Sequence, residues 1–178
     1  LWRSLGASPR VLGVSPDGTR HNLVPFHTKQ LMYIITADDG ISVTNMTSDM
    51  LARLLSDMPT LQELCIVHSP LVSLKRIVQP SSGAAMPGWC QHLTRLTIRY
   101  SQLELLPRDV NLLAGLQRLD VSHNSLEEIP ATIGDLVHLE HLNISDNQLT
   151  RLPCQLGRLA RLTELFAYSN QLASVPDT

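Results

Sequence analysis

The sequence predicts an α/β repeat protein, a solenoid of stacked coils whose short strands form one parallel, concave sheet. Three observations support this fold class. Leucine accounts for 32 of the 178 residues, about twice its ordinary share, whereas aromatic residues make up only 4%. One pattern of apolar positions recurs every 23 residues, and each copy carries a proline at the same place. A core built from one branched aliphatic side chain at a fixed period indicates repeats that stack on one another.

Four regular repeats begin 23 residues apart. Each has apolar residues at offsets 0, 3 and 5, a polar residue at offset 8 and an apolar residue at offset 10. These positions are Leu93, Leu96, Ile98, Ser101 and Leu103; Leu116, Leu119, Val121, Asn124 and Leu126; Leu139, Leu142, Ile144, Asn147 and Leu149; and Leu162, Leu165, Ala167, Asn170 and Leu172. A proline follows at offset 14, as Pro107, Pro130, Pro153 and Pro176. This is the signature of leucine-rich repeats, so residues 93–178 are predicted to form regular coils.

The spacing of these positions has a physical reason. Alternation within each strand places the leucines inward and the intervening side chains on the opposite face of a parallel sheet. The Asn column can bond backbone groups of the following turn and so form a ladder. The proline begins a tight convex segment, where it does not need to donate a hydrogen bond. We expect Leu119, Leu142 and Ile144 to be fully buried.

An earlier and less regular repeat begins at Leu61, 32 residues before Leu93. Its pattern positions are Leu61, Leu64, Ile66, Ser69, Leu71 and Leu74. The excess length falls in residues 79–88, whose Pro, Gly, Ser and Ala content is typical of a loop. We expect residues 59–92 to form an irregular first repeat with an inserted surface loop, because closure entropy grows only slowly with loop length.

Residues 1–58 predict two hairpins followed by a helix. Apolar runs at 11–14 and 21–26 flank one turn signal, and runs at 31–36 and 41–45 flank another. A helix is expected between residue 47, where Thr47-Ser48-Asp49 can cap it, and Pro59. Starting the repeat pattern at Leu31 would bury Thr36 and leave no proline after it, so we reject that register. Four strands and one helix bury too little surface for a stable free-standing domain, so this segment is predicted to be part of a small sheet-plus-helix domain.

Charge, hydropathy and cysteine content exclude several classes of protein. Lys and Arg number 14 and Asp and Glu 16, which is not the basic balance of a nucleic-acid binder. No apolar stretch is long enough to span a membrane, and the start shows no signal-peptide pattern. The three cysteines have neither CxxC spacing nor an even number. We therefore expect an intracellular, reduced protein of the nucleus or cytoplasm, with no direct nucleic-acid or membrane partner.

The candidate binding surface is the concave face, where alternate strand side chains are exposed. The candidate protein-binding residues are Arg95, Thr97, Arg99, Tyr100, Arg118, Asp120, His123, His141, Asn143, Asp146, Glu164, Phe166 and Tyr168. Ser122 and Ser145 fall in the same columns. Arg95, Arg99 and Arg118 beside Tyr100 suit acidic protein segments, because Arg binds carboxylates bidentately. The alternatives are that these are ordinary solvated residues, that Asp120 pairs internally with one Arg, and that Phe166 and Tyr168 pack under a further repeat.

Sequence motifs give no support for catalysis, a metal or a cofactor. No phosphate-binding Gly-rich loop, GxSxG elbow or HExxH motif occurs. The seven His are scattered, so we expect no metal site, no cofactor and no enzymatic activity. Cys154 has no nearby His or acidic partner in the sequence to lower its pKa, and we expect it to be a buried structural thiol.

Hairpins, a helix and short repeats together resemble one protein family, the leucine-rich-repeat substrate receptors of cullin-2 (elongin BC) ubiquitin ligases. The matching residues are Gly18-Thr19-Arg20, the helix Ser48 to Met58, Tyr100, Leu119-Asp120-Val121-Ser122-His123-Asn124, Pro130-Ala131-Thr132-Ile133-Gly134-Asp135-Leu136, Pro153-Cys154, Leu156-Gly157 and Ala167. The resemblance covers most of the chain. It implies that residues 1–58 are part of a pleckstrin-homology-like fold.

The resemblance also implies a function and partners. The repeats would recognise protein substrates, notably ubiquitylated replicative-helicase complexes at the termination of DNA replication. The chain departs from the family by having fewer regular repeats and by ending at Pro176-Asp177-Thr178, without the box that docks elongin BC and cullin-2. The alternative function is a generic intracellular repeat scaffold, for instance in small-GTPase signalling.

Overall fold

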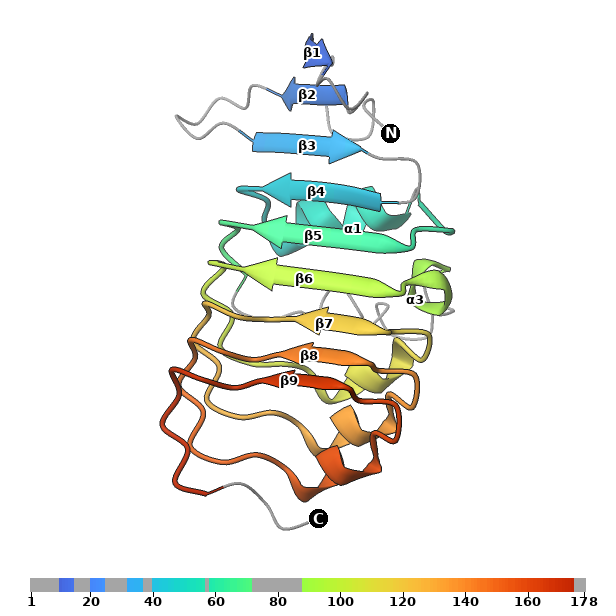
Figure 1. Ribbon diagram of the computed structural model, residues 1–178. Helices are drawn as coiled ribbons and strands as arrows, with labels where there is room; N and C mark the ends of the chain where they lie inside the picture. The colour runs from blue at the N-terminus through green and yellow to red at the C-terminus, as the bar shows by residue number, and fades with distance from the viewer. Residues whose placement is uncertain are drawn as a thin grey trace.

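The computed structural model describes residues 10–14, 20–24, 32–36, 40–56, 58–71 and 88–174. Nine strands form one sheet in the order in which they occur along the chain (Figure 1). They are β1 Arg10–Val14, β2 Arg20–Val24, β3 Met32–Thr36, β4 Gly40–Thr44, β5 Glu63–Val67, β6 Arg95–Arg99, β7 Arg118–Asp120, β8 His141–Asn143 and β9 Glu164–Phe166. The helices are α1 Ser48–Ser56 and α3 Trp89–His92, with 3-10 helices η1 Arg108–Leu112, η2 Ala131–Asp135 and η3 Cys154–Arg158.

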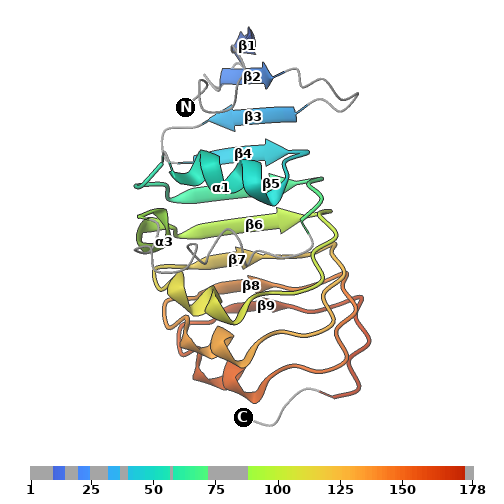
Figure 2. The same ribbon diagram turned by 180° about the vertical axis from the view of Figure 1, so that it is seen from behind.

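The sheet changes from antiparallel to parallel at β4. Strands β1 to β4 pair antiparallel, so the two predicted hairpins are confirmed as strand pairs. From β4 to β9 every neighbouring pair is parallel, as the repeat pattern predicts. These six strands, with the helices behind them, form the predicted solenoid with a concave parallel sheet (Figures 1 and 2).

The solenoid begins one coil earlier than the sequence pattern indicates. Strand β4 pairs in parallel with β5, and Ile41 and Val43 lie opposite Leu64 and Ile66. Ile41, Val43 and Met46 are all buried. Helix α1 then covers the side of β4 and β5 away from the viewer in Figure 1 (Figure 2). Residues 40–56, which the sequence analysis assigned to a separate domain, are therefore a coil whose strand uses Ile and Val in place of Leu.

Helix α1 begins and ends close to the predicted positions. The Thr47 hydroxyl accepts a hydrogen bond from the backbone N–H of Met50, which is 3.5 Å away, and so occupies a capping position. Leu51, Leu54 and Leu55 are buried on one face of the helix, as their spacing predicts. The pleckstrin-homology-like fold that the resemblance implies for residues 1–58 stays a prediction. The surface loop predicted at 79–88 lies outside the described residues except for Gly88, and it stays a prediction as well.

The core is a stack of aliphatic side chains contributed at the same offset by each coil. Leu96, Leu119 and Leu142 face one another across β6, β7 and β8 and are at most 3% exposed. Ile144 is fully buried as well, so the burial predicted for Leu119, Leu142 and Ile144 is confirmed. Each coil covers the apolar face of the previous one, because no single coil has a second layer of its own.

Asparagine side chains join the coils at the turns after β7, β8 and β9, and Ser69 and Ser101 hold the equivalent position after β5 and β6. The Asn147 amide donates to the carbonyl of Val121 in the preceding coil at 3.0 Å and to Ile144 and Ser145 in its own coil. Its carbonyl accepts from the N–H of Leu126 at 3.0 Å. Asn124 and Asn170 repeat this arrangement. The predicted ladder is present, and it bonds the preceding coil as well as the local turn.

The convex side of the regular coils consists of 3-10 turns that begin directly after Pro107, Pro130 and Pro153. Adjacent turns pack closely at Gly134. A Cβ placed on Gly134 would lie 2.4 Å from the backbone carbonyl oxygen of Gln155 in η3. Glycine at this position therefore permits η2 and η3 to approach each other.

Candidate functional site on the concave face

The candidate residues lie in columns that run across the parallel strands. One column joins Arg95, Arg118, His141 and Glu164, and the next joins Thr97, Asp120, Asn143 and Phe166. Glu63 and Cys65 on β5 continue these two columns. Neither β5 residue is among the predicted ones, although the same offsets from Leu61 indicate both. Ser122 and Ser145 are 1% and 0% exposed, so they belong to the interior and not to the surface.

Two of the three predicted arginines are neutralised by acidic partners. Arg95 forms an ion pair with Glu63, a partner that the sequence pattern did not predict. Arg99 forms an ion pair with Asp120 through its Nη2, and its Nε donates to the same carboxylate at 3.0 Å. The internal pairing of Asp120 with an arginine, one of the predicted alternatives, is therefore present. The Arg118 side chain is exposed, and its guanidinium makes no ion pair or hydrogen bond with any residue that the structure describes.

Asp120 is the centre of a small polar network between β7 and its neighbours. Its carboxylate also accepts hydrogen bonds from the backbone N–H and hydroxyl of Ser122, at 3.1 and 2.7 Å. Partial burial raises the pKa of this carboxyl group, but the hydrogen bonds from Arg99 and Ser122 together outweigh burial, so its pKa is lowered. The same hydrogen bond raises the pKa of Arg99. Both groups are charged at neutral pH.

A hollow of about 380 Å³ lies on the concave face around Arg118. Arg95 and Arg99 border it on one side, and His141, Asn143 and Phe166 border it on the other. The His141 Nδ1 lies 2.8 Å from the Glu164 carboxylate, so Glu164, like Asp120, has a partner within the protein. Phe166 is 45% exposed, and it adds an exposed aromatic ring to a hollow that is lined by both polar residues and the strand leucines.

Three aromatic rings form a stack at the carboxyl ends of the strands. The Tyr100 ring lies between His68 and His123, with ring centroids 5.0 and 4.5 Å apart and interplanar angles of 16° and 12°. His123 Nδ1 is 3.6 Å from the Asp146 carboxylate. Tyr100, His123 and Asp146 are among the predicted residues. His68 is not, although it holds the same offset in the repeat that begins at Leu61.

The backbone holds this stack in place. One residue at the equivalent position of each successive coil, just beyond the strand, has φ between 50° and 55°. These residues are Asn45, His68, Tyr100, His123, Asp146 and Ser169. This left-handed conformation is uncommon for residues other than glycine. Because every coil adopts it at the same offset, the side chains at this offset project in parallel, and Tyr100 remains 49% exposed.

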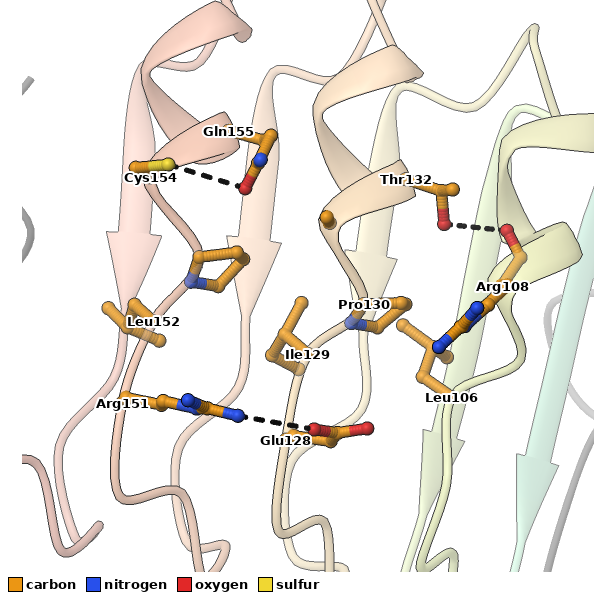
Figure 3. A pocket seen from close by; sticks show the side chains of 12 residues that line it. Leu106, Arg108, Glu128, Ile129, Pro130, Thr132, Arg151, Leu152, Cys154 and Gln155 are labelled. Carbon is orange, nitrogen blue, oxygen red and sulfur yellow. Dashed lines mark hydrogen bonds and ion pairs between the residues drawn. The ribbon is translucent and has the colours of Figure 1, made fainter.

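A second hollow, of about 630 Å³, lies along the convex side (Figure 3). It is crossed by the Arg151–Glu128 pair at 3.9 Å, and the Thr132 hydroxyl donates to the carbonyl of Arg108 at 2.6 Å. Cys154 lies in it and is exposed, so the expectation that it is buried is wrong: its position directly after Pro153 places it on the outer surface of η3. The buried thiol is Cys90, and burial raises its pKa to about 12.

No group of three or more His, Cys, Asp or Glu side chains that could hold a metal ion occurs among the described residues. Within the same part of the chain, no helix is both long and apolar enough to cross a membrane.

The comparisons with known proteins agree with this architecture. A family model described as "Leucine rich repeat" matches residues 91–149 and 114–172. A leucine-rich-repeat protein of Leptospira interrogans is 29% identical, with a TM-score of 0.57, over 68% of this chain and 29% of that protein. An internalin of Listeria monocytogenes is 23% identical, with a TM-score of 0.54, over 76% of this chain and 34% of the internalin. The chain thus spans about a third of each solved structure. No curated protein matches it significantly.

Proposed function

We propose that this chain, whose residues 91–172 are leucine-rich repeats, recognises a protein substrate through its concave face as part of a cullin-2 ubiquitin ligase receptor. Recognition of proteins is the function that the repeat fold supports. The ligase role is the finer step, and it is supported by the resemblance of the sequence motifs to that family. In this role the chain performs no chemistry itself; it positions a substrate for modification.

The exposed ring stack of His68, Tyr100 and His123 is the observation that carries the concave-face proposal. Exposed aromatic side chains are favoured at interface hot spots. Stacking between flanking rings and a fixed left-handed backbone restrict Tyr100 before a partner arrives. A side chain that is already ordered loses less conformational entropy on binding. Tyr100 therefore combines a large contact surface with a small ordering cost.

The test uses the full-length protein, affinity-tagged, in a replicating cell extract. The variant Tyr100→Asn removes the ring but tolerates the left-handed backbone. The matched control is Val137→Asn, since Val137 is a comparably exposed apolar residue at 54% outside the concave strands. We expect Tyr100→Asn to reduce recovery of the ubiquitylated replicative helicase at least about 10-fold, since a hot spot contributes about 2 kcal/mol or more. Cullin-2 and elongin BC should be recovered equally from both variants.

Three results separate the possibilities. Equal helicase recovery with Tyr100→Asn and Val137→Asn would remove the ring stack from the binding surface. Absence of cullin-2 and elongin BC from every precipitate would contradict the ligase role. Recovery of a small GTPase in their place would favour the alternative function as a signalling scaffold.

A further inference from the structure

We infer that the hollow around Arg118 binds one acidic side chain of an extended partner segment, together with an apolar side chain four positions away that contacts Phe166. This inference rests on the proposed function, because it assumes that the concave face binds protein. It specifies the chemistry of the segment that the face accepts.

The charged side chains of the column that crosses the sheet differ in whether they have a partner of opposite charge. Glu63 engages Arg95 at one end of this column, and Glu164 engages His141 at the other. Arg118 stands between Arg95 and His141 in register, and it has no acidic partner among the described residues. Its guanidinium therefore presents unused donors to the hollow, and a guanidinium binds a carboxylate through two parallel hydrogen bonds.

The neighbouring arginines do not compete with Arg118 for a partner carboxylate. Arg99 is held by the Asp120 carboxylate through two nitrogen atoms, and Arg95 is held by Glu63. A partner carboxylate that displaced Asp120 from Arg99 would leave a carboxylate that is only 19% exposed without its hydrogen bonds, which costs free energy. At Arg95 it would only replace the exposed Glu63 carboxylate, with little gain. The arrangement thus favours a single acidic residue at Arg118 over a run of acidic residues.

The hollow around Arg118 has an aromatic side chain at its border. Phe166 lies in the neighbouring column, two strands away from Arg118, and lines the same hollow. Two strand spacings are about 10 Å and two residues along a strand are about 7 Å, so the two positions are about 12 Å apart. An extended segment advances about 3.3 Å per residue and directs every second side chain to the same face. An acidic and an apolar side chain therefore meet Arg118 and Phe166 when they are four positions apart.

The test is a selection followed by a binding measurement with the 178-residue chain. A random 12-residue peptide library displayed on phage is selected on the immobilised protein. We expect enrichment of peptides with Asp or Glu four positions from an apolar residue. A fluorescein-labelled copy of the most enriched peptide is then titrated by fluorescence anisotropy, and amide exchange locates its contact surface.

Matched variants isolate the charge. Arg118→Gln is expected to weaken binding of the peptide about 10-fold or more. Arg161→Gln is the control, because Arg161 is equally exposed, makes no ion pair among the described residues and lies in the turn before β9. Arg118→Glu should reject the selected peptide and bind a version whose acidic residue is replaced by Lys. Phe166→Ser should remove the preference for the apolar residue and leave the acidic preference intact.

The outcomes distinguish this inference from the proposed function. Peptides that protect β6 to β9 from exchange, lack an acidic residue and bind Arg118→Gln as tightly as the wild type would overturn the inference and leave concave-face recognition standing. Protection confined to η1, η2 and η3, or failure to select any peptide, would count against both. Restored binding in the reversed Arg118→Glu and Lys-peptide pair would establish the contact directly.

Discussion

The coil that carries β8 and the coil that carries β9 have the same repeat pattern but different environments. Leu142 in β8 is fully buried, whereas Leu165 at the equivalent place in β9 is 41% exposed. The difference is one of neighbours: β8 pairs with strands on both sides, and β9 pairs in the described chain only with β8. The same leucine pattern thus buries a side chain only when a coil lies on each side of it, as expected of a solenoid in which stability comes from stacking.

The largest expected effect is on the leucines themselves. Leu142→Ala should lower the free energy of unfolding by about 2 to 5 kcal/mol, because it leaves a cavity in a fully packed core. Leu165→Ala should cost less than about 1.5 kcal/mol, since much of its side chain is already in contact with water. Urea denaturation followed by circular dichroism measures both. Equal losses would show that β9 is covered in solution, and an unchanged Leu142→Ala would contradict the repeat register.

The asparagine ladder should show the same gradient on a smaller scale. Asn147→Ala leaves the N–H of Leu126 and the carbonyl of Val121 without their side-chain partners in the interior, which should cost about 2 to 3 kcal/mol. Asn170→Ala removes equivalent bonds in a more exposed coil, where water replaces them, and should cost about 1 kcal/mol. Thermal melts of the two variants test this order, and a reversed order would contradict the assigned difference between the two coils.

The convex turns allow a third comparison, between two glycines. Gly134→Ala should destabilise by about 1 to 3 kcal/mol, because the new Cβ would overlap the backbone of Gln155. Gly115→Ala meets only the carbonyl oxygens of Gln91 and Leu93, at 3.4 and 3.5 Å, and should be neutral or slightly stabilising, since it lowers the entropy of the unfolded chain. Urea midpoints decide this prediction, and a stable Gly134→Ala would show that η2 and η3 separate easily.

The smallest expected effect concerns the Arg99–Asp120 pair and depends on pH. Because the pKa of Asp120 is lowered in the folded state, its contribution to stability is present above about pH 4 and is lost as the pH falls through its folded value. Asp120→Asn should therefore be less stable by about 1 kcal/mol at pH 7, since the pair is partly exposed and screened. The difference should shrink as the pH falls below about 4. A difference that persists there would assign the effect to packing and not to charge.

The sequence predicted the solenoid because its period is local. Leucines at offsets 0, 3 and 5 fix which side chains face inward whatever the coil packs against, and the proline fixes where the convex turn begins. The same offsets predicted the two columns that begin at Arg95 and Thr97, which the strand register shows. They did not reveal the coil at 40–56, because Ile41, Val43 and Met46 follow the inward pattern without its leucines and its asparagine.

The state of each surface charge was decided by the tertiary structure alone. Arg95, Arg99 and Arg118 are the same residue type on neighbouring strands, yet only the first two have an acidic partner among the described residues. Those partners, Glu63 and Asp120, are 32 and 21 residues away in the sequence. The stacking of Tyr100 between His68 and His123 likewise requires three coils in register. A repeat pattern determines the column in which a side chain stands, since that follows from the pleat of its own strand. Which partner it meets there depends on side chains of other coils and on how they reach across the sheet, and only the assembled solenoid brings these together.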